Sequence, residues 1–381
     1  MMSISGVFLI ILFTYLLSLH VVQCKMRLLR EMKQICSSMA SENDKTVACN
    51  FADVEDIGKC FKTSKMDITS SKPIPSQIGL LKNLKFLQIT NNDFSFMQRG
   101  RVLPSSLGCL TKLTHLELAY EFDYGVTGPF STPLFLTSLT KLKHLHLIRT
   151  LVNGTIPSKI GFLTNLQSLV LGSTRLKGSI PLQISFLQKL TSLSLYDGQL
   201  NGTIPIFMQS LTKLAMLDLS YNQLNGRIPS SLQLMTALTA LKLHSNQLSS
   251  TIPSSFGLMT ALTALKLYSN QLSGTIPSSF GLMTALTDLD FYSNQLNGKI
   301  PTSFGSMTSL YYLDLSSNQL NGTIPSSFAS LTSLYYLYLS SNQLNGTIPS
   351  SFGSLTSLYY LDLSSNQLNG KIPSSFGSLT S

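Results

Sequence analysis

The chain carries one pattern of apolar and polar positions that repeats every 24 residues, without insertion or deletion, from Leu139 to Ser378. When each block is numbered from its first apolar residue, apolar side chains fall at positions 1, 4, 7, 9, 14, 18 and 22. The alternation at positions 7 to 9 predicts a short strand, and Gly at 16 and Pro at 19 predict the turn back. A fixed period of this length predicts a solenoid whose strands lie parallel and in register.

A single block is too small to fold alone. It offers roughly eight apolar side chains, each worth about 2 kcal/mol when buried. Ordering its backbone costs roughly 1 to 2 kcal/mol per residue. Stacked blocks share each buried face with a neighbour, so we expect stability to be a sum over the interfaces between adjacent turns.

The same frame organises the rest of the chain. Two blocks of 29 residues, 81–109 and 110–138, keep the opening apolar positions and precede the ten 24-residue blocks at 139–378. Residues 25–80 are predicted to form an N-terminal cap that contains cysteines and ends in a shortened first turn. Residues 379–381 begin a further block, so we expect a longer native product with its own cap, or a partner at this end.

Residues 1–24 contain no charged residue, and the run 7–22 is mostly apolar. This composition predicts a secretory signal peptide, and with it a secreted or cell-surface protein in the extracellular space. The basic residues Lys25, Arg27 and Arg30 follow directly, which is also compatible with an uncleaved membrane anchor. Because the apolar run is short for a membrane span, cleavage is the favoured interpretation.

If the signal peptide is cleaved after Cys24, four cysteines remain in the mature chain, which would enter an oxidising compartment. Four cysteines allow three disulfide connectivities, and the sequence does not choose among them. We expect two of the first three to close the cap, and the last to be either a disulfide partner or a free buried thiol. The four candidates are Cys36, Cys49, Cys60 and Cys109.

Most blocks also carry Asn at position 12, as in the block that starts at Leu331 and contains Asn342, Gly346 and Pro349. The full pattern resembles the plant-type extracellular leucine-rich repeat, LxxLxxLxLxxNxLxGxIPxxLGx, over 139–378. The resemblance implies an α/β repeat fold: a leucine-rich-repeat solenoid with a parallel β-sheet on the concave face and 3-10 or irregular segments on the convex face. It extends to polygalacturonase-inhibitor-like proteins, receptor-like proteins and receptor kinase ectodomains, although the cap lacks the tryptophan usual in plant members.

The Asn at position 12 is expected to be buried, with its amide bonded to the backbone of neighbouring turns. Blocks two to five depart from this rule, because the slot holds Glu121, Thr150, Thr174 and Gly198. The predicted ladder consists of Asn92, Asn222, Asn246, Asn270, Asn294, Asn318, Asn342 and Asn366.

The formal net charge of +10 is unevenly distributed along the chain. Residues 139–210 hold seven basic residues and one acidic residue, a surplus of six that exceeds that of any other region. A predicted basic edge therefore favours an acidic protein or an anionic glycan as partner. Equally, these lysines could serve only to keep a leucine-rich body soluble. The edge consists of Lys112, Lys141, Lys189 and Lys213 at position 3, with Lys143 and Arg149 nearby on the strand face.

Positions 6, 8 and 10 point outward from each strand, because the leucines at 7 and 9 point inward. Aromatic residues gather in these columns and form a surface of the kind that is enriched in protein interfaces and sugar contacts. Recent duplication of one exposed tyrosine pair would explain their number equally well. The candidate ligand-binding tyrosines are Tyr196, Tyr268, Tyr292, Tyr312, Tyr336, Tyr338 and Tyr360.

Two groups of titratable residues on the same face are candidate metal sites. His115, Glu117, His144 and His146 have the chemistry to bind zinc, but solvated side chains on an open sheet are the favoured interpretation. Asp288, Asp290 and Asp314 could bind calcium, but a row of surface salt bridges that pairs Lys266 with Asp290 is the better account. We therefore predict no metal and no cofactor.

Four glycosylation sequons, all Asn-Gly-Thr, place their Asn at position 15. A shared position puts any glycans on one flank and leaves the strand face open. The predicted acceptors are Asn153, Asn201, Asn321 and Asn345.

The combined prediction is a non-enzymatic recognition protein of the defence or signalling type. It would bind a protein, peptide or anionic polysaccharide through the strand face and the basic edge, and no nucleic acid. No catalytic motif is present, and an open sheet offers no water-excluded pocket. A structural or adhesive spacer is the alternative. Ice binding is a third possibility, which Arg227, Lys299 and Lys371 weaken because they interrupt the hydroxyl column at position 17.

Overall fold

The computed structural model describes residues 64–69, 76–91, 104–120, 130–131, 134–150 and 152–378. The predicted signal peptide, Cys36, Cys49, Cys60 and Asn92 lie outside the described residues. The chain divides into two compact units. The first unit is described within 64–120 and 134–142, and the second consists of 130–131 and the described residues from Lys143 onward.

The first unit contains a parallel sheet backed by short 3-10 helices. Leu87 of one strand pairs with Leu116 of the next, and both side chains are buried. These strands and helices are β1 (Lys65–Thr69), β2 (Phe86–Asn91), β3 (His115–Tyr120), η1 (Ser76–Leu80), η3 (Ser105–Cys109) and η4 (Leu134–Ser138).

The second unit contains two parallel sheets, and the first of them carries the predicted strands. Leu217 pairs with Leu241, and Leu241 pairs with Leu265, so each block places the same position in the same column. The strands of this first sheet are β5 (His144–Ile148), β7 (Ser168–Gly172), β9 (Ser192–Ser194), β11 (Met216–Asp218), β13 (Ala240–Lys242), β15 (Ala264–Lys266), β17 (Asp288–Asp290), β19 (Tyr312–Asp314), β21 (Tyr336–Tyr338) and β23 (Tyr360–Asp362).

A second sheet of 11 strands covers a flank that we expected to be irregular. Its register is shifted: Ser273 at position 15 pairs with Gln295 at position 13 of the next block. The strands are β4 (Phe130–Ser131), β6 (Val152–Gly154), β8 (Arg175–Gly178), β10 (Gln199–Thr203), β12 (Gln223–Gly226), β14 (Gln247–Thr251), β16 (Gln271–Thr275), β18 (Gln295–Lys299), β20 (Gln319–Thr323), β22 (Gln343–Gly346) and β24 (Gln367–Leu368).

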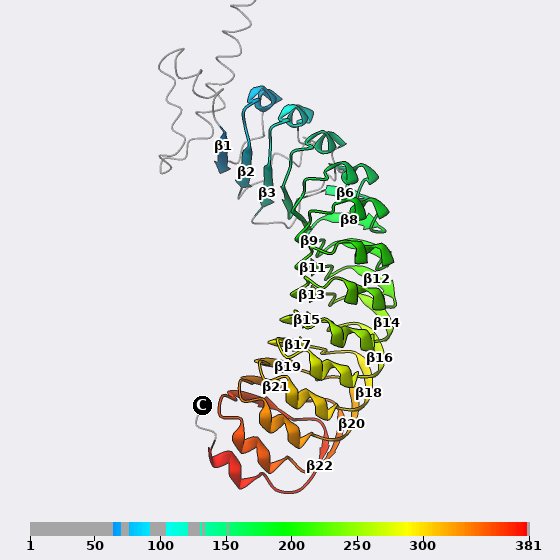
Figure 1. Ribbon diagram of the computed structural model, residues 1–381, viewed down its shortest axis with the longest axis vertical. Helices are drawn as coiled ribbons and strands as arrows, with labels where there is room; N and C mark the ends of the chain where they lie inside the picture. The colour runs from blue at the N-terminus through cyan, green and yellow to red at the C-terminus, as the bar shows by residue number, and fades with distance from the viewer. Residues whose placement is uncertain are drawn as a thin grey trace, which may run out of the picture. The chain divides into compact units, whose positions relative to one another are not determined.

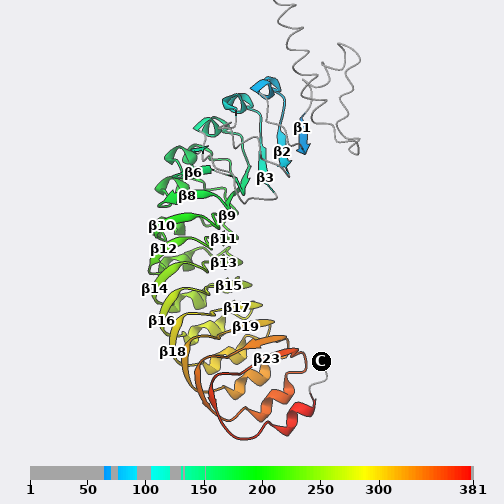
Figure 2. The same cartoon turned by 180° about the vertical axis from the view of Figure 1, so that it is seen from behind.

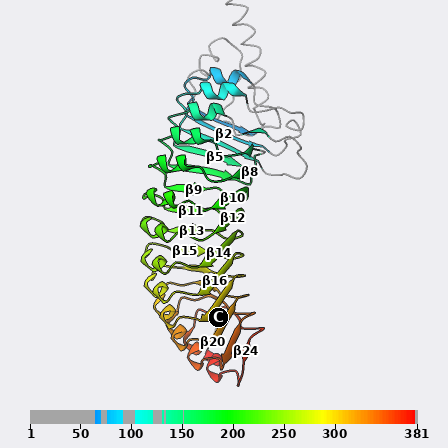
Figure 3. The same ribbon diagram turned by 90° about the vertical axis from the view of Figure 1, so that its right-hand side faces the viewer.

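A 3-10 helix follows the proline at position 19 of each turn, on the flank that lies away from the second sheet (Figure 3). Proline suits this place because its fixed φ, −66° at Pro277, leads into the first helical residue without requiring an N–H donor. These helices are η5 (Ser158–Phe162), η6 (Leu182–Phe186), η7 (Ile206–Ser210), η8 (Ser230–Leu234), η9 (Ser254–Leu258), η10 (Ser278–Leu282), η11 (Thr302–Ser306), η12 (Ser326–Ser330), η13 (Ser350–Ser354) and η14 (Ser374–Ser378).

The core of the second unit lies between the two sheets and the helices. Leucines at positions 4, 7, 9 and 14 fill it, and phenylalanines at position 22 seal the helical side. The rings of Phe328 and Phe352 stack with centroids 6.4 Å apart, so these two turns share an aromatic layer, whereas Ile160, Ile184, Met208 and Leu232 hold the position in earlier turns.

Position 12 links neighbouring turns through buried amides. The Asn318 amide donates to the carbonyls of Phe291, Leu315 and Ser316, and its oxygen accepts from the Leu296 N–H. The same contacts recur for Asn222, Asn246, Asn270, Asn294, Asn342 and Asn366.

The predicted fold class is confirmed, with the second sheet as an addition to it. Within the second unit the turns stack along a curve, and the first sheet lies on the inner side (Figure 1). The strands of the second sheet follow the outer side, as the view from behind shows (Figure 2). The first sheet therefore presents an open, concave strand face.

Candidate functional site

The strand face of the second unit carries a dense group of aromatic side chains near its C-terminal end. Positions 5, 6 and 8 of three consecutive blocks contribute them, around β19, β21 and β23. We call this group the tyrosine patch: Tyr311, Tyr312, Tyr335, Tyr336, Tyr338, Tyr359 and Tyr360.

The rings of the tyrosine patch contact one another in an ordered way. Tyr335 stacks on Tyr311 at 5.1 Å and on Tyr359 at 5.0 Å, with interplanar angles of 14° and 15°. Tyr336 and Tyr338 stack at 6.3 Å. Such packing holds the rings rigid, and Tyr359 is still 62% exposed. Rigid exposed aromatic area is characteristic of binding surfaces, since little side-chain entropy is lost on contact.

An acid pair borders the patch on the side of β17. Asp290 and Asp314 lie side by side as register partners on the neighbouring strands β17 and β19, and both side chains are buried. The Ser316 N–H and hydroxyl donate to Asp314 Oδ1, while the Tyr312 hydroxyl donates to Asp314 Oδ2 at 3.3 Å. The Tyr292 N–H donates to Asp290 Oδ1 at 3.1 Å.

Burial dominates the electrostatics of the acid pair. It raises the pKa of Asp290 to about 7, although the hydrogen bond from the Tyr292 N–H lowers it. The neighbouring Asp314 carboxylate raises the pKa further. Burial likewise raises the pKa of Asp314, although the hydrogen bonds from Ser316 and Tyr312 oppose this effect. The pair is therefore held at a higher proton affinity than an exposed aspartate.

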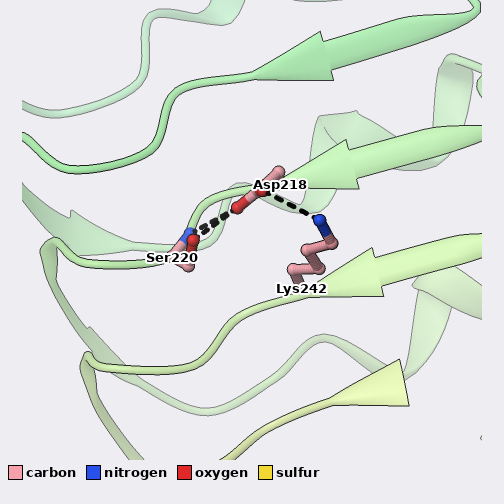
Figure 4. Close-up of polar contacts among 3 residues, drawn as sticks. All are labelled: Asp218, Ser220 and Lys242. Atoms are coloured by element: carbon pink, nitrogen blue, oxygen red, sulfur yellow. Dashed lines mark hydrogen bonds and ion pairs between the residues drawn. The ribbon is translucent and has the colours of Figure 1, made fainter. Parts of the chain in front are cut away.

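A second cluster lies on the neighbouring strands β11 and β13. Asp218 Oδ2 forms an ion pair with Lys242 Nζ at 3.6 Å, and Asp218 Oδ1 accepts from the Ser220 hydroxyl at 2.6 Å (Figure 4). We had expected a salt bridge between Lys266 and Asp290 instead. Among the residues that the structure describes, that pair is not within ion-pair distance, although the two lie side by side in register.

His244 lies buried beside this ion pair, between two tyrosine rings. Tyr268 stacks on it at 4.1 Å, and Tyr221 meets it edge-on at 5.2 Å. Burial lowers the pKa of His244 to about 4, with Lys266 and Lys242 adding to the effect and Asp218 opposing it. The imidazole is therefore neutral at neutral pH, and its buried Nδ1 has no hydrogen-bond partner among the described residues.

The predicted basic edge is divided between the two units. Lys112 and Lys141 belong to the first unit, where Lys112 donates to Asn83 Oδ1 at 2.8 Å. Lys189 and Lys213 belong to the second unit, where Lys189 donates to Asn165 Oδ1 at 2.7 Å. Lys143 and Arg149 are exposed in the second unit as well.

The histidines weighed as a zinc site also divide between the units. His115 and Glu117 belong to the first, whereas His144 and His146 belong to the second and meet edge-on at 6.2 Å. His146 Nε2 forms a hydrogen bond with the Ser168 hydroxyl at 2.8 Å. Within the described parts of the chain, no group of three or more metal-ligating side chains converges.

The remaining predicted tyrosines lie apart from the tyrosine patch. Tyr196 covers Gly172, where an added Cβ would lie 2.1 Å from its ring. Tyr268 belongs to the His244 cluster, and Tyr292 is 42% exposed next to the acid pair. The aromatic residues therefore form a discontinuous row along the strand face.

The sequons lie on the second sheet, away from the strand face. Asn201, Asn321 and Asn345 are exposed there, and Asn153 is half-buried. Cys109 is a free, exposed thiol at the end of η3. The alternative of a buried thiol was wrong, because this residue ends a helix on its solvent side.

Sequence reasoning missed the most tightly packed parts of this face. Tyr221 was overlooked because position 11 lies outside the strand columns, yet its ring contacts His244. Tyr311, Tyr335 and Tyr359 are the first members of the duplicated tyrosine pairs and were not predicted as binding residues, although they form the central stack. The repeated tyrosine pair at positions 5 and 6 was the signal that could have located it.

The sequence of the second unit matches the family model described as leucine rich repeat. The matches overlap and cover residues 188–248, 236–296, 260–320, 293–344, 308–368 and 332–381, which together span more than half of the chain. No curated protein sequence matches this chain significantly.

Two similar solved structures are receptor ectodomains from Arabidopsis. One is the ectodomain of the receptor kinase GASSHO1/SCHENGEN3 in complex with CASPARIAN STRIP INTEGRITY FACTOR 2, at 32% identity and TM-score 0.69, covering 85% of this chain and 41% of the other. The second is the receptor kinase HAESA with the peptide hormone IDA and the co-receptor SERK1, at 27% identity and TM-score 0.65, covering 92% and 67%. The chain thus spans less than half of the GASSHO1 ectodomain.

A third similar structure is a plant ice-binding protein, with 37% identity and a TM-score of 0.52 over 58% of this chain and 72% of the other. The repeat pattern, the stacked parallel strands, the asparagine ladder and the family match agree with one another. This chain belongs to the leucine-rich repeat family, with the repeat type found in plant receptor ectodomains.

Proposed function

We propose that this chain is a non-enzymatic recognition module that binds a protein or peptide through its strand face. The tyrosine patch is the observation that carries this proposal. It presents rigid aromatic area on an open concave sheet, and monomeric proteins rarely expose such area without a partner. The sequons lie on the second sheet, so glycans there would leave this surface accessible.

The similar receptor ectodomains support the same proposal. One was solved in complex with CASPARIAN STRIP INTEGRITY FACTOR 2, and the other with the peptide hormone IDA and a co-receptor. They support an extracellular or cell-surface location, in line with the signal peptide expected at residues 1–24. Over the described part of the chain, none of the helices has the length and apolarity needed to span a membrane.

The basic edge is proposed as a second contact surface. Lys143, Arg149, Lys189 and Lys213 are exposed in the second unit and would attract an acidic protein or an anionic glycan. A defence or signalling role fits a module of this kind. Binding that survives deletion of residues 139–210 would rule out this part of the proposal.

The strand-face proposal is tested by panning a displayed random peptide library on the wild-type protein. We expect the enriched peptides to lose at least tenfold in affinity for a variant with Tyr336→Ala, Tyr338→Ala and Tyr360→Ala, since central aromatic residues dominate binding energy. A matched control replaces Gln319, Gln343 and Gln367 on the second sheet by Ala and should bind normally. Enriched peptides that bind both variants equally would refute the proposal.

Ice binding is a second candidate, favoured by the second sheet. From β10 onward, its positions 13, 15 and 17 carry mostly amide and hydroxyl groups, and Arg227, Lys299 and Lys371 interrupt them at position 17. Because of the shifted register, the rows run obliquely, as in Thr251, Ser273 and Gln295, so a lysine at position 17 interrupts one oblique row rather than the whole face. The exposed glutamines at position 13 are Gln199, Gln223, Gln247, Gln271, Gln295, Gln319, Gln343 and Gln367.

The similarity to a plant ice-binding structure supports this second candidate. It is tested by measuring thermal hysteresis and ice recrystallisation with protein that lacks glycans. Substitution of Gln295→Lys and Gln319→Lys interrupts two further rows and should weaken both effects, whereas Tyr336→Ala on the strand face should change neither. Absence of any effect in the wild-type protein would dismiss ice binding.

A further inference from the structure

The strand face between β17 and β23 is acidic although the chain as a whole is basic. Its outward residues include Asp288, Asp290, Asp314 and Asp362 and no Lys, Arg or His. The two lysines of residues 283–378, Lys299 and Lys371, stand at position 17 on the second-sheet flank. The local charge of the strand face is therefore opposite to the net charge of +10.

The carboxylates lie among the rings of the tyrosine patch. In one column, Tyr338 pairs in register with Asp314 on one side and with Asp362 on the other. The Tyr338 ring contacts Tyr312 at 5.7 Å and Tyr360 at 4.9 Å. Negative charge and exposed aromatic faces thus occupy one continuous surface.

Within the described residues, the acid pair forms no ion pair, although the charge of Lys266 acts on Asp290 from the next strand. Among the residues that the structure describes, neither Asp290 nor Asp314 forms an ion pair, and the register neighbour Lys266 stays beyond ion-pair distance. Burying carboxylates without a positive partner is costly. A cation supplied by a ligand would remove that cost, so the pair favours a positively charged ligand group.

Asp362, at the other end of the surface, is ready to accept a positive group as well. The Ser364 hydroxyl and N–H donate to Asp362 Oδ1 at 2.7 Å and 3.0 Å, and these bonds lower the pKa of Asp362. Its carboxylate is therefore ionised at neutral pH. Aromatic faces between the two acidic positions add cation–π attraction for guanidinium or ammonium groups.

We infer that the tyrosine patch, together with Asp290, Asp314 and Asp362, binds an extended segment of the ligand that carries lysine or arginine side chains. The inference rests on the proposed strand-face function and names the class of its ligand. Charge complementarity and the unbalanced acid pair argue for this occupant over an acidic or neutral one.

The geometry also sets the spacing of the basic residues. From β17 to β23 there are three strand spacings, which amount to about 14 Å. An extended peptide rises about 3.3 Å per residue, so basic residues about four positions apart reach both ends of the surface. Intervening side chains would lie over Tyr336 and Tyr338.

The experiment uses labelled synthetic peptides of the sequence Gly-Arg-Gly-Ser-Gly-Arg-Gly, with the arginines replaced by glutamate or by citrulline as controls. We expect the arginine peptide to bind the wild-type protein at least tenfold more tightly than either control, and less tightly as salt rises. Replacing Asp290→Asn together with Asp314→Asn should reduce its affinity at least tenfold. Replacing Asp218→Asn, which lies outside the patch, should leave it unchanged.

Thermal unfolding of each variant separates a loss of binding from a loss of folding. If the arginine peptide binds no better than the glutamate peptide, the inference is overturned. If panned peptides bind the tyrosine patch but carry no basic residues, the inference fails while the strand-face function stands. If panned peptides ignore the Tyr336, Tyr338 and Tyr360 substitutions, the strand-face function fails as well.

Discussion

At the scale of single residues, two buried titratable groups on the strand face respond to pH in opposite directions. His244 has a lowered pKa, so the folded state resists its protonation. Burial raises the pKa of Asp290, so the folded state resists its ionisation; Asp314 and Asp288 add to the rise, and the Tyr292 N–H and Lys266 oppose it. Between pH 4 and 7, His244 therefore destabilises the fold at the acidic end and Asp290 at the neutral end.

Single substitutions should separate these two effects. The His244 contribution is present above the unfolded pKa of 6.5 and is lost as pH falls towards 4. The Asp290 contribution is present below 3.8 and is lost as pH rises through about 7. We therefore expect His244→Gln to make the stability fall more steeply with rising pH in this range, and Asp290→Asn to make it rise.

Urea unfolding at several pH values checks this prediction. At pH 8, Asp290→Asn should stabilise the protein by about 1 to 2 kcal/mol, because it removes a buried charge. Asp218→Asn serves as a comparison, since Asp218 is already paired with Lys242. Parallel pH profiles for the His244 and Asp290 variants would contradict the assignment.

Another residue-scale prediction concerns backbone strain at Ser250. Position 16 is glycine in nine other turns, where φ lies between 72° and 83°, whereas Ser250 adopts a φ of 77° with a side chain. That region is unfavourable for any residue with a Cβ. Ser250→Gly should stabilise the protein by about 1 kcal/mol in urea unfolding. The reverse change, Gly274→Ser, should destabilise the protein. If Ser250→Gly and Gly274→Ser both leave the free energy of unfolding unchanged, the backbone at position 16 is not strained.

At the scale of elements, the asparagine ladder connects neighbouring turns from Asn222 to Asn366. The Asn318 side chain alone forms hydrogen bonds with three carbonyls and one N–H, which belong to its own turn and to the preceding turn. Asn318→Ala should cost about 2 to 4 kcal/mol, because these buried groups lose their partner. Exposed Asn297→Ala, on the second sheet, should change the free energy of unfolding by less than about 0.5 kcal/mol.

The second sheet shows how an element can be visible in sequence and still be misread. The run Gln319–Thr323 alternates exposed and buried positions around Leu320, which is a strand pattern. The family resemblance implies irregular or 3-10 structure there, whereas the residues form a strand. Its two-residue shift was not predictable, because it depends on how far each turn slides against the next.

At the scale of the whole molecule, near-identical turns should be removable one at a time. Deleting 331–354 or 235–258 joins blocks in the same frame, so the ladder and both sheets remain continuous. Since stability is a sum over adjacent interfaces, both deletions should fold and reduce the urea m-value by roughly a tenth. Only the first removes Tyr335, Tyr336 and Tyr338.

The two deletions also separate recognition from a spacer role. A recognition module should lose peptide binding when 331–354 is deleted and retain it when 235–258 is deleted. A spacer would tolerate both. Circular dichroism and urea titration confirm that each shortened protein is folded before binding is compared.

Spacing and side-chain chemistry alone settle the repeat, the inward and outward columns and the family, because every turn obeys the same local periodicity. They also place four tyrosines of the patch, Tyr312, Tyr336, Tyr338 and Tyr360, on one face. Which carboxylates are buried, which lysine pairs with Asp218 and how His244 comes to lie between two rings depend on contacts between turns. Those contacts are long-range, and near-identical sequences acquire different surroundings from them, so only the stacked molecule reveals an acidic, aromatic strand face on a basic protein.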